Sequence, residues 1–422
     1  MLLLGFSSGL PLALTSGTLQ AWMTVEGLDI KTIGFFTLVG QAYVFKFAWA
    51  PLMDRYAPRL AHLGRRRGWL LVTQLALAGL IAMMGSTSPA HALGALAVLA
   101  VLVAFGSASQ DIVFDAYRTD VLPASERGAG AALSVLGYRL AMIVSGGLAL
   151  WLADHWLGWR GMYWLMAGLM GVGLATTLLL APEPTDAQRA PRTLDEAIVA
   201  PWKQFFSRRG ALAFLVLIVL YKLGDAFAGA LTTAFLIRGV GFSAGEVGLV
   251  NKSFGLATTI IGALVGGALM SRIGLVRSLL SFGLLQLLSN LAYWALAVTP
   301  KNLGAMAAAV GIENLCGGMG TAAFVALLMA LCDKRYSATQ YALLSALASV
   351  GRVYVGPVSG WLVEGGTVTV GASTLFSIPA LGWPGFFLAT VAIGVPGVLL
   401  LWFMRGRLDA LDTSQSSQND SR

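Results

Sequence analysis

The stretch LGALAVLAVLVAFGSASQDIVFDAYRTD, residues 93–120, joins an apolar run long enough to begin a membrane span to two carboxylates. Asp111 and Asp115 are four residues apart, so they share one helix face if the helix continues. Two carboxylates on one stripe of low dielectric cannot both be ionised cheaply. The stretch therefore predicts a membrane helix with a site that holds and releases a proton.

The composition of the whole chain indicates an integral membrane protein. Of the 422 residues, 57% are hydrophobic and only 11% are charged, whereas soluble domains carry about 25% charged residues. Cys316 and Cys332 lie in one apolar run and offer neither a disulfide framework nor a metal cluster. No metal or other cofactor is expected. The net charge of +8 does not indicate nucleic-acid binding, because the basic residues concentrate in alternate loops.

Runs of about 20 mostly apolar residues predict twelve membrane helices and an all-α fold. Most of the 28 Lys and Arg residues lie in loops on one side of these spans. By the positive-inside rule, both termini are expected in the cytoplasm. The expected spans are 2–25, 33–53, 68–86, 92–116, 129–152, 160–181, 211–236, 245–270, 275–298, 303–331, 338–363 and 382–404.

Echoes between segments about 215 residues apart indicate two duplicated six-span halves. PLMDRYAP (51–58) is echoed by ALMSRIGL (268–275), and AALSVLGYR (131–139) by ALLSALASVGR (342–352). Chance similarity between apolar helices is the alternative. The expected organisation is an N-terminal half at 1–181, a cytoplasmic linker with a short amphipathic helix at 182–210, a C-terminal half at 211–405 and a disordered tail at 406–422.

Charged side chains inside a bilayer cost about 2.5 kcal/mol or more each, so those in the expected spans should face a cavity or one another. Lys222 and Asp225, three residues apart, either neutralise each other or bind substrate directly. Asp115 is expected near the cytoplasmic end of its span, where it could pair with Arg118 or Arg55. The expected proton-coupling residues are Asp111, Asp115, Glu313 and Asp225; the alternative for each acid is a static salt bridge.

Uncharged polar side chains near these charges suit a large hydroxylated or peptidic ligand better than a small ion. If one acid is protonated, the bases in the spans outnumber the ionised acids, and the cavity favours an anionic substrate. The uncharged candidates for substrate binding are Gln20, Gln41, Tyr43, Gln110, Tyr138, Tyr221, Asn251 and Asn314.

Two six-span halves joined by a cytoplasmic linker, with a basic turn after the second span, resemble the major facilitator superfamily. The superfamily's loop motif, Gly-x-x-x-Asp-Arg-x-Gly-Arg-Arg, is matched here without its leading glycine and with a longer spacer. The resemblance implies that these charges couple the halves during rocking; topogenic positive charge alone is the alternative. The residues concerned are Asp54, Arg55, Arg65, Arg66 and Arg67.

Longer strings resemble the AmpG family of anhydromuropeptide permeases over nearly all twelve spans. The resemblance implies proton-driven import of N-acetylglucosaminyl-1,6-anhydro-N-acetylmuramyl peptides across the inner membrane of Gram-negative bacteria. It also implies a role in cell-wall recycling and an effect on β-lactamase induction. The strings are GLPLALTSGTLQAWM (9–23), KTIGFFTLVGQAYVFKFAWAPLMDRY (31–56), SQDIVFDAYRTDVLP (109–123), LYKLGDAFA (220–228) and ENLCGGMGTAAFVALLM (313–329).

The carboxylates of such a substrate agree with the expected cationic cavity. The substrate-anion candidates are therefore Arg139, Lys222, Lys252 and Arg352, with Lys46 nearer the cytoplasmic side. The expected partners are the muropeptide, protons and the lipid bilayer, and the chain is expected to be monomeric.

Other functions stay open at this point. Another major facilitator transporter could carry acetyl-coenzyme A or small peptides, and a muropeptide sensor would bind without transporting. A membrane enzyme acting on lipid-linked sugars would need a nucleophile or a metal constellation, but His62, His91 and His155 are scattered in loops. The chain has no Walker A motif, which disfavours an ATP-driven pump. A transporter, rather than an enzyme, is therefore expected.

Overall fold

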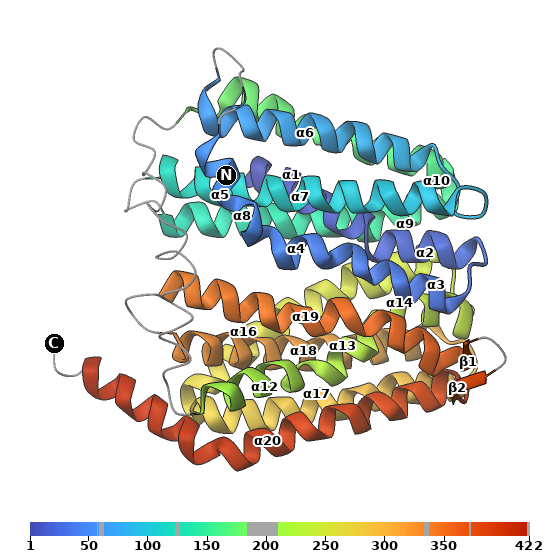
Figure 1. Cartoon of the computed structure of the whole chain (residues 1–422), viewed down its shortest axis with the longest axis vertical. Helices are drawn as coiled ribbons and strands as arrows, with labels where there is room; N and C mark the ends of the chain where they lie inside the picture. The colour runs from blue at the N-terminus through green and yellow to red at the C-terminus, as the bar shows by residue number, and fades with distance from the viewer. Residues whose placement is uncertain are drawn as a thin grey trace. The chain divides into compact units, whose positions relative to one another are not determined.

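The computed structural model describes residues 1–56, 58, 63–122, 127–183, 210–332, 337–370 and 373–419. Within these ranges the chain forms helices joined by turns, together with one two-stranded β hairpin (Figure 1). The expected linker helix after residue 183 lies outside the described residues. The predicted helical membrane fold is confirmed, and the hairpin is an addition that the sequence did not predict.

Nine helical segments of the described ranges are long and apolar enough to cross a membrane. One of them, Ala132–Leu180, has 49 residues and contains the expected fifth and sixth spans, which are separated at Gly158, where φ is +62°. The expected second span is divided into short helices, and the expected eleventh span is a helix outside these nine. The protein is therefore a multi-span membrane protein, while the count of twelve spans stays a prediction.

The chain divides into two compact units, and neither is one continuous piece of sequence. Each unit contains a short segment that the sequence assigns to the opposite half: the start of the second span in unit 2, and the start of the eighth span in unit 1. Unit 1 comprises Met1–Asp29, Phe36–Ala190 and Leu236–Ser253, and unit 2 comprises Ile30–Phe35, Pro191–Phe235 and Phe254–Arg422.

Small residues let the helices of unit 1 pack closely, as is common in membranes. A Cβ on Gly137 of α8 would lie 2.0 Å from the carbonyl oxygen of Leu2, so α1 and α8 touch backbone to backbone. The elements of unit 1 are α1 Leu2–Leu14, α2 Gly17–Val25, η1 Phe36–Gly40, α4 Gln41–Phe45, η2 Lys46–Ala48, α5 Ala50–Arg55, α6 Gly64–Gly85, α7 Leu93–Val121, α8 Arg127–Met142, η3 Ile143–Leu148, α9 Ala149–Leu152, η4 Ala153–Leu157, α10 Gly158–Ala175, η5 Thr176–Leu180 and α15 Ala244–Val247; η7 Phe235–Gly239 and η8 Gly248–Phe254 each begin or end at a unit boundary.

Unit 2 uses the same kind of contact, because a Cβ on Gly318 of α18 would lie 2.2 Å from the carbonyl oxygen of Thr259 of α16. Its last helix continues to Asn419 through the segment for which the sequence predicts a disordered tail. The helices of unit 2 are α3 Ile30–Phe35, α12 Ala211–Tyr221, α13 Leu223–Ala230, α14 Thr232–Ala234, α16 Gly255–Ile273, α17 Leu275–Val298, α18 Leu303–Ala330, α19 Ser337–Glu364 and α20 Gly382–Asn419.

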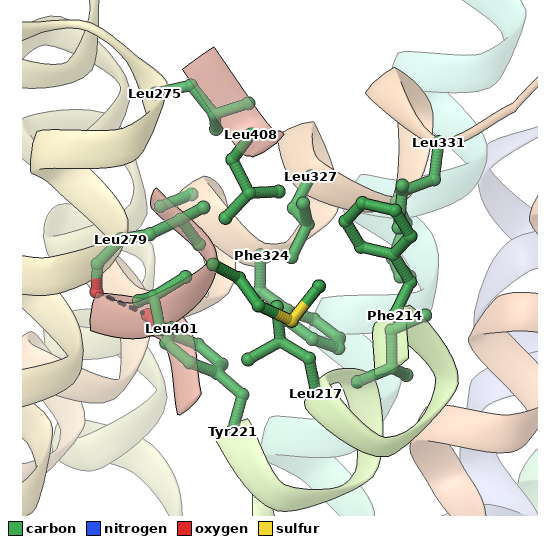
Figure 2. Close-up of a cluster of buried hydrophobic side chains, with 14 of the residues drawn as sticks. Phe214, Leu217, Tyr221, Leu275, Leu279, Phe324, Leu327, Leu331, Leu401 and Leu408 are labelled. Atoms are coloured by element: carbon green, nitrogen blue, oxygen red, sulfur yellow. Dashed lines mark hydrogen bonds between the residues drawn. The ribbon is translucent and has the colours of Figure 1, made fainter. Parts of the chain in front are cut away.

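A cluster of buried hydrophobic side chains joins α12, α17, α18 and α20 in unit 2 (Figure 2). Tyr221 and Phe324 stack within it, with their ring centroids 5.5 Å apart and an interplanar angle of 2°. The Tyr221 hydroxyl donates a hydrogen bond to the carbonyl oxygen of Leu279 at 3.1 Å. The cluster therefore anchors the end of α12, immediately before Lys222.

The β hairpin lies between α19 and α20 (Figure 1). Strand β1, Gly366–Val370, pairs antiparallel with β2, Ser373–Ile378, with Gly366 opposite Ile378 and an irregularity after Val368. The β-branched residues of the sequence TVTV favour an extended strand over a helix. Gly365, with φ of +67°, adopts the left-handed conformation that ends α19 before the strand.

Two short helices have backbone amides bonded to carboxylates that come from the end of another span. In unit 2 the backbone N–H of Ile30 in α3 donates to Oε1 of Glu364 in α19 at 3.0 Å. In unit 1 the backbone N–H of Gly245 in α15 donates to Oδ2 of Asp154 in η4 at 3.0 Å. Ile30 and Gly245 are separated by about the same interval as the sequence echoes, and so are Asp154 and Glu364. We call these contacts the two carboxylate caps.

Glycines bring the same two pairs of spans into backbone contact. A Cβ on Gly34 would lie 2.4 Å from the carbonyl oxygen of Gly356, and one on Gly248 would lie 2.6 Å from that of Gly147. Gly34 and Gly248 are again about 215 residues apart. The repeated glycine contacts and carboxylate caps support the internal duplication that the echoes indicate.

Candidate functional site

A half-buried polar cluster in unit 1 surrounds Asp111 of α7. The hydroxyl of Ser8 in α1 donates a hydrogen bond to Oδ1 of Asp111. The ammonium group of Lys46 and the hydroxyl of Tyr43 are close enough to interact electrostatically with the same carboxylate. One step before it, Gln110 donates from Nε2 to Oγ of Ser7 at 3.2 Å. The structure thus brings together three predicted site residues, Asp111, Lys46 and Tyr43, which we call the Asp111 cluster.

The first span is broken close to this cluster. Pro11 lies inside α1, where it has no N–H for the helical ladder. The hydroxyls of Thr15 and Ser16 donate back to the carbonyl oxygens of Pro11 and Leu12, and α2 then begins at Gly17. Discontinuous membrane helices of this kind commonly line ligand sites in transporters.

Lys252 in η8 approaches the break between α1 and α2. A Cβ on Gly17 would lie 2.8 Å from Nζ of Lys252, so the ammonium group lies directly against the backbone there. Asn251 is its neighbour in η8 and is half-buried. Both are predicted substrate-binding residues, and only Lys252 is seen at the helix break.

Asp115 lies in different surroundings from Asp111, although the two share a face of α7. Its side chain is 54% exposed and lies 3.2 Å from Nη2 of Arg118. Of the two expected partners, Arg118 is thus seen to pair with Asp115, while the side chain of Arg55 lies outside the described residues. Asp115 is therefore the more exposed of the two carboxylates, since Asp111 is half-buried.

A second polar cluster, in unit 2, surrounds Lys222 at the break between α12 and α13. Its Nζ atom lies 3.6 Å from Oδ2 of Asp225, 3.3 Å from Oε1 of Gln286 in α17 and 3.2 Å from Oγ1 of Thr321 in α18. Lys222 and Asp225 thus lie within ion-pair distance, which was one of the two alternatives for them, and direct binding of substrate stays a prediction. Gln286 and Thr321 complete what we call the Lys222 cluster.

Glu313 lies on α18 and accepts a hydrogen bond from the hydroxyl of Tyr293 at 3.4 Å. Tyr293 is 1% exposed and also interacts electrostatically with Asp225. One phenol therefore faces both predicted proton-coupling acids of unit 2. The neighbouring Asn314 is bonded to Thr259 at 2.9 Å and to the carbonyl oxygen of Val310 at 2.9 Å, which uses its amide in packing α16 against α18.

The remaining predicted substrate residues are not gathered in either cluster. Arg139 is exposed on α8, with Nη1 lying 3.8 Å from the sulfur of Met142, and Arg352 is exposed on α19. Tyr221 is buried in the hydrophobic cluster of Figure 2. Gln20, Gln41 and Tyr138 are half-buried. Their roles in substrate binding stay predictions.

The arginines after the second span make contacts within unit 1. Nε of Arg66 lies 2.8 Å from Oδ2 of Asp120, and both side chains are nearly inaccessible, at 6% and 5% exposure. The Glu183 carboxylate accepts hydrogen bonds from the backbone N–H groups of Arg66 and Arg67, each at 3.0 Å, at the start of α6. Negative charge is favourable at that end of a helix.

Arg67 of α6 hydrogen-bonds to the end of the sixth span. Its Nε donates to the carbonyl oxygen of Thr177 at 3.1 Å, and its Nη2 donates to that of Leu178 at 3.0 Å. Arg65, of which the side chain is half-buried, belongs to the same turn. The side chains of Asp54 and Arg55 lie outside the described residues, and a role of these five residues between the halves stays a prediction.

Several residues of these clusters were not predicted from the sequence. Ser8, Gln286, Thr321 and Tyr293 are uncharged polar residues within apolar runs, like the glutamines and tyrosines that were predicted. Gln286 in LLQLLSN is as conspicuous as Gln110, so the same criterion could have found it. Ser8 and Thr321 carry no such signal, because hydroxyl side chains often bond to their own helix.

Comparison with known proteins identifies the family. The family description "Major Facilitator Superfamily" matches residues 1–224. Solved structures share the fold: a nucleoside transporter, NupG, covers 96% of this chain and 97% of its own with a TM-score of 0.70 at 13% identity. A POT family transporter in complex with a thioalcohol-conjugated peptide covers 96% and 95% with a TM-score of 0.70 at 15% identity.

Sequence relatives are much more similar. "Anhydromuropeptide permease" of Escherichia coli (strain K12) is 65% identical over 409 residues, which cover 97% of this chain and 80% of the relative. "Putative transporter AmpG 4" of Rickettsia conorii is 32% identical, covering 96% of each chain. These relatives are permeases and transporters and not enzymes. The chain therefore belongs to the AmpG family of anhydromuropeptide permeases, within the major facilitator superfamily.

Proposed function

We propose that this protein imports N-acetylglucosaminyl-1,6-anhydro-N-acetylmuramyl peptides through the bacterial inner membrane, driven by the proton gradient. The assignment of the substrate rests on the 65% identity, over 97% of the chain, to an anhydromuropeptide permease. Import of this cargo serves peptidoglycan recycling and affects β-lactamase induction. The chain acts as a monomer by alternating access, with both termini in the cytoplasm.

The Asp111 cluster supports proton coupling. Asp111 accepts a hydrogen bond from Ser8 and has Lys46 as its nearby cation. A carboxylate within a membrane span is tolerated when it is paired or protonated, and such acids commonly carry protons in transporters. Asp111 takes up a proton on one side of the membrane and returns it on the other, while Lys46 balances its charge when it is ionised.

The Lys222 cluster supports recognition of an acidic cargo. Lys222 is 14% exposed at the side chain, and its only carboxylate within ion-pair distance, among the described residues, is Asp225 at 3.6 Å. A carboxylate of the muropeptide competes with Asp225 for the same ammonium group. Protonation of Asp225 weakens that competition. Proton binding and cargo binding are therefore coupled at Lys222.

The first expected result tests cargo and energy source together. Vesicles containing the protein should accumulate labelled anhydromuropeptide when a pH gradient, acidic on the extracytoplasmic side, is imposed, and collapse of the gradient with a protonophore should return the level to equilibrium. Unlabelled acetyl-coenzyme A and a short peptide serve as competitors. Competition by either compound, with none by muropeptide, would assign a different cargo. Binding without gradient-dependent accumulation would identify a sensor or a facilitator.

A further inference from the structure

We propose that Gln286, seated against Gly320, is the positioning residue of Lys222 and holds its ammonium group ready for an acidic group of the cargo. This inference rests on the function proposed above, and it assigns a role to two residues that the sequence pattern does not predict. It explains in addition why α18 has a glycine at position 320.

The ammonium group of Lys222 is held mainly by uncharged acceptors. An ammonium group has three N–H donors and no acceptor, so the oxygen rather than the nitrogen of the Gln286 amide faces it. Oε1 of Gln286 at 3.3 Å and Oγ1 of Thr321 at 3.2 Å lie within hydrogen-bond distance, whereas Oδ2 of Asp225 at 3.6 Å lies beyond it. Asp225 is therefore the one of these three partners that does not hydrogen-bond the ammonium group.

Thr321 and Gln286 have fixed acceptor roles. The hydroxyl hydrogen of Thr321 is donated to the carbonyl oxygen of Gly317 at 2.7 Å, so its oxygen is left to accept from Lys222. The side chain of Gln286 is 5% exposed, and its Nε2 atom has no hydrogen-bond partner among the described residues. The amide is thus kept in place by Lys222 and by the surface of α18, and not by a second hydrogen bond of its own.

Gly320 provides the space that the amide occupies. A Cβ at position 320 would lie 2.4 Å from Oε1 of Gln286, a distance at which the amide has to move. Gly317, one turn earlier on the same helix, differs: a Cβ there would lie 3.6 Å from Nε2, which is ordinary van der Waals contact. Alanine at 320 therefore displaces the acceptor from Lys222, while alanine at 317 leaves it in place.

Without the Gln286 oxygen, the ammonium group turns toward its remaining charged neighbour. A closer contact with Asp225 would neutralise Lys222, because opposite charges at short range in a poorly solvated site attract strongly. An acidic cargo would then have to break an ion pair before it could bind. Gln286 holds the ammonium group 3.6 Å from Oδ2 of Asp225 instead of in a tighter ion pair, and this makes Lys222 available to the cargo.

The test compares Gly320→Ala with Gly317→Ala, its matched control, in vesicles under a fixed pH gradient. Two probes are used: anhydromuropeptide with free carboxylates, and the same compound with those carboxylates converted to amides. We expect Gly320→Ala to raise KM for the acidic probe about tenfold, corresponding to about 1.4 kcal/mol, with little change for the amidated probe. Gly317→Ala should behave as the unmodified protein does with both probes.

Gln286→Met provides a second route that does not crowd α18. It removes the acceptor while keeping the length of the side chain, and it should reproduce the selective rise in KM even if Gly320→Ala fails to fold. An equal loss for the acidic and the amidated probe would reduce Gln286 to a packing role and overturn the proposal. Unchanged KM in Gln286→Met would do the same. Failure of the unmodified protein to accumulate either probe would count against the proposed function instead.

Discussion

Asp111→Asn is expected to abolish gradient-driven accumulation of muropeptide. The amide has the size of the carboxylate and can still accept the hydrogen bond from Ser8, but it cannot take up and release a proton. Exchange of labelled for unlabelled cargo across the membrane, which requires no net proton movement, should persist. The measurement is the steady-state accumulation ratio under an imposed pH gradient, set beside the exchange rate without one.

Asp115→Asn is the control for this experiment. It makes the same chemical change one turn further along α7, at a carboxylate that is 54% exposed and paired with Arg118. Although the sequence places Asp115 among the proton-coupling candidates, its exposure leads us to expect that this variant keeps most of the accumulation. If Asp111→Asn accumulates cargo as the unmodified protein does, Asp111 has no part in proton coupling. If it loses exchange as well as accumulation, Asp111 acts in cargo binding or in folding.

The second large effect concerns stability. Arg66→Leu should lower the free energy of unfolding by about 3 kcal/mol, because it leaves the Asp120 carboxylate buried without its cation. The exposed fractions of 6% and 5% for the two side chains show that water cannot readily replace the lost partner. A clear fall in the thermal unfolding midpoint of the purified protein in detergent would report this loss.

Two further variants distinguish the effect of burial on the unfolding midpoint from the effect of removing a charge. The double change Arg66→Leu with Asp120→Leu removes both charges and should recover most of the stability, since apolar pairs can replace buried ion pairs. Arg118→Leu breaks the more exposed pair with Asp115 and should cost less than about 1 kcal/mol. Equal midpoints for Arg66→Leu and Arg118→Leu would show that burial of the Arg66 pair carries no special energy.

The sequence predicted those features that depend on short-range pattern. Apolar run length identified the membrane helices, because the bilayer fixes the length of a span. A spacing of three residues gave the contact between Lys222 and Asp225 and that between Asp115 and Arg118 as alternatives, and the structure has both. Asp115 and Arg118 lie on one helix, and Lys222 is the N-cap of the helix that carries Asp225, so local geometry alone brings each pair together.

Features that depend on contacts between distant segments could not be predicted in this way. Gln286 meets Lys222 across 64 positions of sequence, and no periodicity within α17 indicates which side chain it will face. The exchange of Ile30–Phe35 and Leu236–Ser253 between units depends on helix packing in the same manner. The hairpin was not predicted because residues 366–378 fall between two long apolar runs. Run length identifies membrane spans and does not distinguish a short strand pair from a loop.

The two carboxylate caps have a consequence for the origin of the chain. Each cap joins the end of one span to the start of another, and the two spans belong to different halves of the sequence. Asp154 caps the helix start at Gly245, and Glu364 caps the helix start at Ile30. An ancestral six-span polypeptide would have carried both the carboxylate and the helix start that it caps. Two copies of that polypeptide would form the contact twice, with each copy acting once as donor and once as acceptor, as in a self-complementary homodimer. Gene fusion would then have preserved an intersubunit bond as an intramolecular one, with Asp at the cap in one copy and Glu at the cap in the other.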